Sequence, residues 1–207
     1  MQWSVFGIQC AGRESREGEL LILGPADWRL NTESSLVWFL DYAPNARLVL
    51  NPISDADFAE LHAILTEPGV RRYLCDNVII PESQTREFIG RSRELLTDER
   101  AGLWGVRTNS DPQLLGCVGF WYFHEPPRLE LLFAMSERVW RRGYACEASL
   151  RIIEYGREQL RLRSILASTD SPNLASIALL EKLGFVLTEE RVSNGLPTSF
   201  FELREAS

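Results

Sequence analysis

The segment Trp140–Ala148 (WRRGYACEA) constrains this chain more than any other, because it has the pattern of a glycine turn that opens a long helix. Apolar residues continue at helical spacing beyond it, through Ile152. The first backbone N–H groups of a helix lack partners within the helix, and the helix start carries partial positive charge. Gly143 lets the backbone approach a ligand and two arginines add charge, so the turn is suited to hold a diphosphate. Similar turns also begin ordinary helices, and the flanking sequence has to decide between these readings.

The flanking residues predict a parallel crossover. Upstream, residues 128–135 (RLELLFAM) have the composition of a strand, and downstream Ser164–Thr169 (SILAST) has that of a short buried strand. A strand, a turn, a helix and a strand in this order form a right-handed connection between parallel strands. A second helix is expected to begin at Ser171-Pro172-Asn173, where Ser171 can cap and Pro172 suits the first helical position, and to end at Gly184.

The other segments have the signals of antiparallel strands and two more helices. Arg47–Ile53 predicts a first strand, Ser54 and Asp57 have the spacing of a reciprocal helix cap, and Pro81 opens an amphipathic helix. Residues 102–107 and 114–123 are expected to pair, and residues 185–192 and 199–203 to form a closing hairpin around Asn194-Gly195.

Composition and charge exclude several classes of function. The 207 residues are 45% hydrophobic and carry a formal charge of −7, without the basic stretch of a nucleic-acid binder, so we expect no nucleic-acid partner. The cysteines at positions 10, 75, 117 and 146 and the two histidines lack the spacing of a zinc or redox site, so no metal is expected. No stretch has the pattern of a signal sequence or a membrane span, which predicts a soluble cytoplasmic protein with no membrane partner.

Residues 1–45 differ from the rest and are expected to be an N-terminal extension. They combine a polar turn, an apolar run and a short helical pattern. Trp3, Trp28 and Trp38 argue against a disordered tail, because such tails are poor in aromatic residues. Packing on the core is the preferred interpretation, and a lid or a dimer contact is the alternative.

Three motifs together carry a family resemblance: the turn Gly143-Tyr144-Ala145, the pair Asn173 and Ser176, and Glu181–Phe185 (EKLGF). With them, the chain resembles the GNAT superfamily of acetyl-CoA-dependent N-acetyltransferases over residues 46–205. Trp140 and the run that follows the turn are similar to the branch that acetylates the N-termini of ribosomal proteins. The resemblance implies an α/β (α+β) fold with a mixed, mostly antiparallel central sheet, flanking helices and splayed parallel strands at the cofactor cleft. It also implies the possibility of a homodimer.

The resemblance implies acetyl-CoA as cosubstrate and assigns residues to it by position. Asn173 and Ser176 are expected to contact the pantetheine arm or the thiol region, with capping of the second helix as the alternative. A backbone N–H of the strand that contains residue 130 is expected to bind the oxyanion. The expected cofactor-binding residues are Phe133, Ala134, Met135, Arg141, Arg142, Gly143, Tyr144, Ala145, Asn173 and Ser176.

Glu130 is the leading candidate for a general base. Side chains two residues apart on a strand share a face, so Glu130 stands with Leu132 and Ala134 among apolar neighbours, where a carboxylate holds a proton more readily. The resemblance implies that an acidic residue at this position accepts the proton of the amine, directly or through water. The alternative is a solvated or arginine-paired glutamate on the sheet surface. Glu147 is the second candidate, and stabilisation of the helix start is its preferred explanation.

The resemblance supplies no evident acid for the departing thiolate. Many relatives have a tyrosine seven positions after the asparagine of the second helix, where this chain has Leu180. Ser176, Tyr144 and water remain as proton donors, and Ser176 is kept as a candidate catalytic residue. A thiol has a pKa near ~8.5, so its anion can leave without an acid.

Two further reactive side chains have structural explanations that are preferred. Cys146 follows the turn directly, but no histidine lies near it in sequence, so a small core residue is favoured over a nucleophile. His124 stands beside Glu125 and either lines the acceptor cleft or forms a surface pair near a turn; the surface pair is the preferred reading.

A site with one candidate base and no evident acid favours an acceptor amine that is already partly neutral. A lysine has a pKa of ~10.4, whereas an α-amino group has one of ~7.7–8.0. We therefore expect direct attack of a peptide N-terminus or a small amine on the thioester. The alternative from another class is a non-catalytic acyl-CoA-binding regulatory module; a nucleotide-binding crossover fold is weaker, because no Gly-x-Gly-x-x-Gly or phosphate-loop motif is present.

Overall fold

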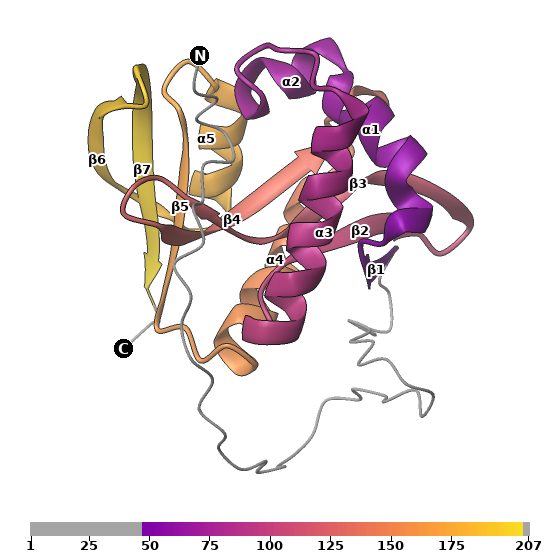
Figure 1. The fold of residues 1–207 in the computed structure, drawn as a ribbon. Helices are drawn as coiled ribbons and strands as arrows, with labels where there is room; N and C mark the ends of the chain where they lie inside the picture. The colour runs from indigo at the N-terminus through magenta and orange to yellow at the C-terminus, as the bar shows by residue number, and fades with distance from the viewer. Residues whose placement is uncertain (1–46, 205–207) are drawn as a thin grey trace.

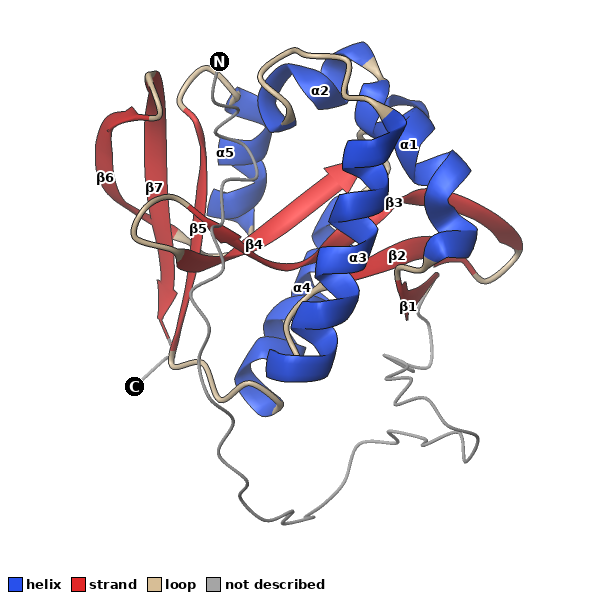
Figure 2. Ribbon diagram, in the orientation of Figure 1, coloured by secondary structure: helices blue, strands red, loops and turns tan. Residues whose placement is uncertain are grey.

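A seven-stranded sheet with the order β1-β2-β3-β4-β5-β7-β6 organises residues 47–204, which are the residues that the computed structural model describes (Figure 1). The extension expected at residues 1–45 lies outside the described residues. Neighbouring strands run antiparallel, with the exception of the parallel pair β4 and β5. Helices lie on both faces of the sheet (Figure 2). The mixed, mostly antiparallel α/β fold expected from the sequence is confirmed.

The element bounds follow the sequence patterns closely, apart from α2, which was not expected from the sequence. The strands are β1 (Leu48–Pro52), β2 (Leu103–Thr108), β3 (Asp111–Phe123), β4 (Arg128–Met135), β5 (Ser164–Asp170), β6 (Val186–Ser193) and β7 (Leu196–Arg204). The α-helices are α1 (Phe58–Thr66), α2 (Pro68–Leu74), α3 (Glu82–Glu99), α4 (Tyr144–Glu158) and α5 (Leu174–Lys182), and single 3-10 turns form η1 (Asp55–Asp57) and η2 (Glu137–Val139). None of the helices within residues 47–204 is both long enough and apolar enough to cross a lipid bilayer.

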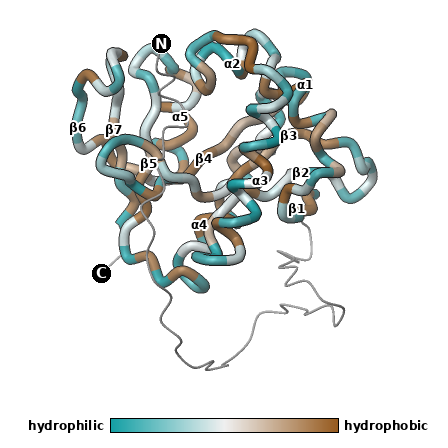
Figure 3. Tube along the Cα trace, in the orientation of Figure 1, coloured by the Kyte–Doolittle hydropathy of each residue, from teal (hydrophilic) through white to brown (hydrophobic). Residues whose placement is uncertain are grey.

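Apolar side chains from both faces of the sheet form two clusters. One cluster joins the sheet to α4 and α5, which contribute Ile152 and Leu180. The other joins it to α1, α2 and α3, which contribute Leu61 and Phe88. α3 alternates between hydrophilic and hydrophobic segments along its length, as an amphipathic helix on a sheet does (Figure 3).

The parallel pair in the middle of the sheet is the feature that positions the site. A single residue pair, Glu130 with Leu166, registers β4 against β5. On their other sides, β4 pairs with β3 along its whole length and β5 pairs with β7 along its whole length. Figure 1 shows β4 turning away from β5. The two strands therefore diverge beyond Glu130, which is the splay that the family resemblance implied.

One local prediction was wrong. Asn173, not Ser171, caps α5: its side-chain oxygen accepts the Ser176 backbone N–H at 3.3 Å. The Ser171 hydroxyl instead shares a hydrogen bond with Ser199 of β7 at 2.8 Å. A partner from a distant strand thus overrides the local capping preference of serine.

The other turn signals are confirmed. The carboxylate of Asp57 accepts the backbone N–H of Ser54 at 2.7 Å, which is the acidic half of the expected reciprocal cap. Asn194 and Gly195 have φ values of 53° and 84°, so both adopt the left-handed conformation that a tight hairpin between β6 and β7 requires. Gly184 has a φ of 89° and stands directly after the C-cap of α5.

Candidate active site

The turn before α4 has the geometry of an anion cradle. Gly143 adopts a φ of 82° at the N-cap, and a Cβ placed there would meet nothing closer than the Arg47 guanidinium at 3.6 Å. Backbone conformation rather than crowding therefore requires glycine. The first intrahelical bond runs from the Glu147 N–H to the Gly143 carbonyl at 3.0 Å. The N–H groups of Tyr144 and Ala145 precede that bond and have no backbone partner within residues 47–204, so they are suited to a ligand, as at other helix starts.

The arginines of the turn face solvent. Arg141 and Arg142 are exposed, and their side chains contact no partner among residues 47–204 in any hydrogen bond or ion pair. Arg141 itself has a φ of 61°, so the chain turns sharply just before the helix. The predicted cradle residues are thus brought together at one exposed helix start.

Glu147, the second candidate for a base, is held by Arg47. Its two carboxylate oxygens accept the Arg47 backbone N–H at 3.0 Å and the Arg47 Nε at 2.9 Å. The Arg47 guanidinium also lies 4.9 Å from the centre of the Tyr144 ring. These contacts fasten the start of α4 to the residue before β1, which gives Glu147 a structural partner.

The linker between β4 and α4 is tied to α2 through Trp140, a contact that sequence reasoning missed. The Trp140 indole N–H donates to the Met135 carbonyl at 2.7 Å. The indole also packs over Gly69, where an added Cβ would lie 2.5 Å from the ring. Glu67 accepts the Ser136 hydroxyl at 2.8 Å and the Glu137 N–H at 2.6 Å. No local sequence pattern predicts these contacts, because α2 lies far from the linker in sequence.

The direction of the backbone N–H groups alternates along β4, and this alternation determines which of them face the gap between β4 and β5. The Ser136 N–H donates to the Leu115 carbonyl of β3 at 2.8 Å. Successive residues of a strand point their N–H groups to opposite sides, so the N–H of Ala134 also faces β3. The N–H groups of Phe133 and Met135 then face the side from which β5 has diverged. Of the three residues expected at the oxyanion position, Phe133 and Met135 have the suitable orientation and Ala134 does not.

Glu130 lies buried between polar and apolar neighbours. Its side chain is 1% exposed, and its Oε2 accepts the Ser168 hydroxyl of β5 at 2.5 Å. Its Oε1 accepts no hydrogen bond from residues 47–204, although His124 Nε2 lies 3.5 Å and Arg128 Nε 3.9 Å away. The solvated surface glutamate considered from the sequence is therefore excluded, whereas the arginine partner named in the same alternative is present as Arg128. The expected apolar setting was only partly right, because a hydroxyl, an imidazole and a guanidinium lie beside Leu132 on this face.

His124 is not the surface residue that the sequence favoured. Its side chain is 11% exposed. Nε2 lies 2.9 Å from the Ser168 hydroxyl, and Nδ1 lies 3.1 Å from the Ser193 hydroxyl. Its ring lies 5.0 Å from that of Phe200. These partners stand on β5, β6 and β7, so only a correct arrangement of strands could have revealed the placement.

The start of α5 holds Asn173 in place and leaves Ser176 available. The Asn173 amide oxygen accepts the Ser176 N–H, and its amide nitrogen donates to the Thr169 hydroxyl at 3.1 Å. These contacts agree with the alternative from the sequence, in which Asn173 caps the helix. The Ser176 hydroxyl makes no hydrogen bond to the described residues. Leu180, which stands where many relatives have tyrosine, is 1% exposed and packs in the core.

Two carboxylates between α2 and the end of β5 also escaped sequence reasoning. Burial raises the pKa of Asp76, and it also raises the pKa of Asp170, with a smaller contribution from the negative charge of Asp76. The Tyr73 hydroxyl, on α2, donates to the Pro172 carbonyl at 3.4 Å. The two segments therefore meet beside the start of α5. Within residues 47–204, no three side chains of the metal-binding types gather in a possible metal site.

The comparison with known families identifies the fold. Residues 47–186 match the family described as acetyltransferase (GNAT) domain. The chain belongs to this family. The GNAT relative YoaA of Bacillus subtilis, named as an uncharacterized N-acetyltransferase, is 30% identical over 156 residues, which cover 73% of this chain and 88% of YoaA.

Solved GNAT structures have the same architecture. An acetyltransferase from Agrobacterium tumefaciens superposes with a TM-score of 0.70 at 20% identity and covers 86% of this chain and 99% of its own. The ribosomal L7/L12 α-N-protein acetyltransferase RimL, in complex with coenzyme A, superposes with a TM-score of 0.66 at 13% identity and covers 80% of this chain and 97% of its own. At these identities the likeness concerns the fold.

Proposed function

We propose that this GNAT protein transfers the acetyl group of acetyl-CoA to a primary amine, with Glu130 as the proton acceptor. The observation that carries the proposal is the position of the Glu130 carboxylate, which is 1% exposed and belongs to the one residue pair that β4 and β5 share before they diverge. A buried carboxylate beside the diverging strands of an acetyltransferase fold is suited to take a proton from an attacking amine.

The start of α4 supports acetyl-CoA as the cosubstrate. Free N–H groups at Tyr144 and Ala145, with the exposed arginines Arg141 and Arg142, suit the phosphates of coenzyme A. The left-handed turn at Gly143 keeps this helix start open. The complex of RimL with coenzyme A is further support, because that protein has a similar fold.

In the proposed reaction, a named group assists each bond change. The bound acetyl-CoA supplies a thioester carbonyl, whose carbon forms a bond to the amine nitrogen while the bond to sulfur breaks. Glu130 takes the proton that the nitrogen loses. The N–H groups of Phe133 and Met135 face the splay and stabilise the negative charge that develops on the carbonyl oxygen. Ser176 or water returns a proton to the thiolate, which is a tolerable leaving group at a thiol pKa of ~8.5.

The acceptor we propose is a peptide N-terminus or another amine that is partly neutral at physiological pH. One buried base without an evident strong acid is better matched to an α-amine with a pKa of ~7.7–8.0 than to a lysine with one of ~10.4. The carboxylates of Asp76 and Asp170 place negative charge beside the start of α5, which attracts a cationic amine toward the site.

Thiol release from acetyl-CoA tests the proposal. The wild-type chain is mixed with acetyl-CoA and a panel of N-terminal peptides, lysine peptides, polyamines and aminoglycosides, and cofactor binding is measured by calorimetry on the same preparation. We expect binding and amine-dependent release. Binding without release from any amine on the panel would favour a non-catalytic acyl-CoA-binding module instead, and absence of binding would contradict the proposed cosubstrate.

A further inference from the structure

A chain of hydrogen bonds leads from the buried base toward the surface. We propose that Ser168 and His124 carry the proton that Glu130 receives out of the site, so that the base is reset after each cycle. This inference rests on the proposed function, because it concerns the fate of the proton that the amine loses.

The distances along the chain are those of hydrogen bonds throughout. Glu130 Oε2 and Ser168 Oγ are 2.5 Å apart, and Ser168 Oγ and His124 Nε2 are 2.9 Å apart. His124 Nδ1 continues to the Ser193 hydroxyl at 3.1 Å. Side-chain exposure rises from 1% at Glu130 to 11% at His124, and Ser193 is half-buried at the end of β6. The path therefore runs from the interior toward solvent.

Such a path serves Glu130 because its carboxylate has little contact with solvent within residues 47–204. A protonated carboxyl group at 1% exposure has almost no contact with bulk water, and the base must lose its proton before the next amine can react. Its Oε1 has no hydrogen-bond partner among the described residues, so Ser168 on Oε2 is the described route. The other basic side chain beside it, Arg128, cannot accept a proton.

The transfer balances at each step. The amine nitrogen gives its proton to Glu130. In the resting site the Ser168 hydroxyl proton is donated to Glu130, so His124 Nε2 carries the ring proton, and exchange with solvent first moves that proton to Nδ1. The Glu130 carboxyl then donates its proton to Ser168 Oγ while the Ser168 hydroxyl proton passes to His124 Nε2. The resulting imidazolium loses its Nδ1 proton to water, directly or through the Ser193 hydroxyl, which passes its own proton to water. Glu130, Ser168 and the Nε2–H form of His124 are then as they were at the start, and one proton has reached solvent.

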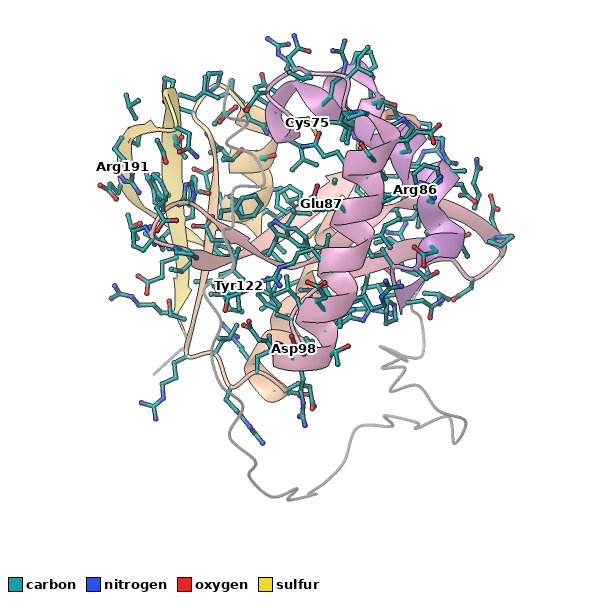
Figure 4. All side chains as sticks on the ribbon, viewed as in Figure 1. Cys75, Arg86, Glu87, Asp98, Tyr122 and Arg191 are labelled. Atoms are coloured by element: carbon teal, nitrogen blue, oxygen red, sulfur yellow. The ribbon has the colours of Figure 1, made fainter. Side chains whose placement is uncertain are left out.

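Charged side chains from β4 and β6 surround His124. Glu130 and Arg128 face it from β4, and Arg191 (labelled in Figure 4) approaches from β6. The two guanidinium groups lie 5.4 and 4.2 Å from the centre of the Phe200 ring, against which the imidazole also packs. Guanidinium groups stay protonated at working pH, so they shape the local field without accepting the proton.

The backbone at His124 permits a clean test. Its φ of 67° is one that glycine adopts without strain, so His124→Gly removes the imidazole while keeping the turn. Free imidazole can then enter the vacated space. Arg161→Gly is the matched control, because Arg161 is exposed and has a φ of 56°.

We expect kcat for amine acetylation to fall about tenfold or more in His124→Gly, with KM for acetyl-CoA unchanged, and to recover in part when imidazole is added. Ser168→Ala should show a similar fall, without recovery in imidazole. The double variant His124→Gly/Ser168→Ala should lose no more than the worse single variant, because both side chains serve one path. Arg161→Gly should retain wild-type activity with and without imidazole.

Wild-type kcat in His124→Gly, or a fall that imidazole does not reverse in a folded protein, would overturn the proton path. Failure of the proposed function looks different: the wild-type chain would then release no thiol with any amine, or Glu130→Gln would be as active as wild type. An inactive Glu130→Gln together with a fully active His124→Gly would reject the path alone.

Discussion

Arg47 and Glu147, one hundred positions apart in sequence, form a two-point contact in which the backbone N–H and the guanidinium of the arginine both donate to the carboxylate. The contact joins the residue before β1 to the first turn of α4, where the proposed phosphate cradle begins. It explains why an acid stands beside a site for an anionic ligand: its charge is matched by the arginine, which also lies against the Tyr144 ring.

Substitution of Glu147 by glutamine tests whether this acid is structural. The ion pair is partly exposed, with side-chain exposures of 54% and 24%, so its loss should cost no more than about 1 kcal/mol. We expect Glu147→Gln to weaken acetyl-CoA binding by less than about tenfold in calorimetry and to leave kcat close to wild type. Glu154→Gln, an exposed acid on the same helix, is the control. A collapse of kcat with unchanged binding would instead assign the proton transfer to Glu147.

The acceptor preference follows from the protonation of the amine. Initial rates with a free-N-terminus peptide should exceed those with an N-blocked lysine peptide of matched sequence near pH 7.5. The reason is that, for a lysine with a pKa of ~10.4, the protonated form exceeds the neutral form about a thousandfold at this pH, whereas an α-amine is partly neutral. Mass spectrometry of the products identifies the acetylated nitrogen. A faster reaction with the lysine peptide would contradict this preference.

Removal of one carboxylate of the Asp76 and Asp170 pair should stabilise the fold near neutral pH. Their pKa values are raised in the folded state, so ionisation costs stability as pH rises through those values, and the cost is absent in acid. Asp76→Asn should therefore raise Tm near pH 7, through a gain in unfolding free energy below about 1 kcal/mol, because solvent screens these groups. The gain should vanish toward pH 3.

Two features make the Tm of Asp76→Asn straightforward to interpret. Asparagine tolerates the φ of 49° at position 76, so the backbone is not disturbed. Glu87→Gln is the control, because Glu87 is an exposed acid in the middle of α3 (Figure 4) and should leave Tm unchanged. A lower Tm for Asp76→Asn at pH 7 would show that the carboxylate makes a net favourable contact.

Thiol reactivity should separate the cysteines by burial. Burial raises the pKa of Cys75 to about 11 and that of Cys117 to about 12, so neither forms an appreciable thiolate at pH 8. In a Cys10→Ala background, a disulfide reagent should label the half-buried Cys146 first and reach the other two only on unfolding. Rapid labelling of all three thiols in the folded protein would contradict the packing of Cys75 (Figure 4) and Cys117.

The sequence predicted the elements of the site better than the contacts between them. The crossover from β4 through α4 to β5 follows from hydrophobic periodicity and from Gly143, which are local signals. The burial of Glu130 was expected because strand alternation is also local. His124 was misplaced because its partners Ser168 and Ser193 lie 44 and 69 residues away along the chain.

Partners that are distant in sequence also explain the other incorrect or missing predictions. Ser171 has the composition of a cap, yet its hydroxyl bonds to Ser199 on β7, and the cap passes to Asn173. Trp140 was given no structural role, although its indole joins the β4–α4 linker to α2. Side chains whose partners come from distant elements are determined by the packing of the whole sheet, which periodicity alone does not describe.

Single-turnover acetyl transfer by Glu130→Gln tests the central claim most directly, with acetyl-CoA binding measured on the same protein. Glu202→Gln is the matched control, because Glu202 also accepts a serine hydroxyl across a strand pair, from Ser164 at 2.5 Å, and takes no part in the proposed chemistry. The account predicts that Glu130→Gln binds acetyl-CoA like wild type and transfers it ~10²–10⁴-fold more slowly, while Glu202→Gln stays active. A wild-type transfer rate in Glu130→Gln across the pH range would contradict it.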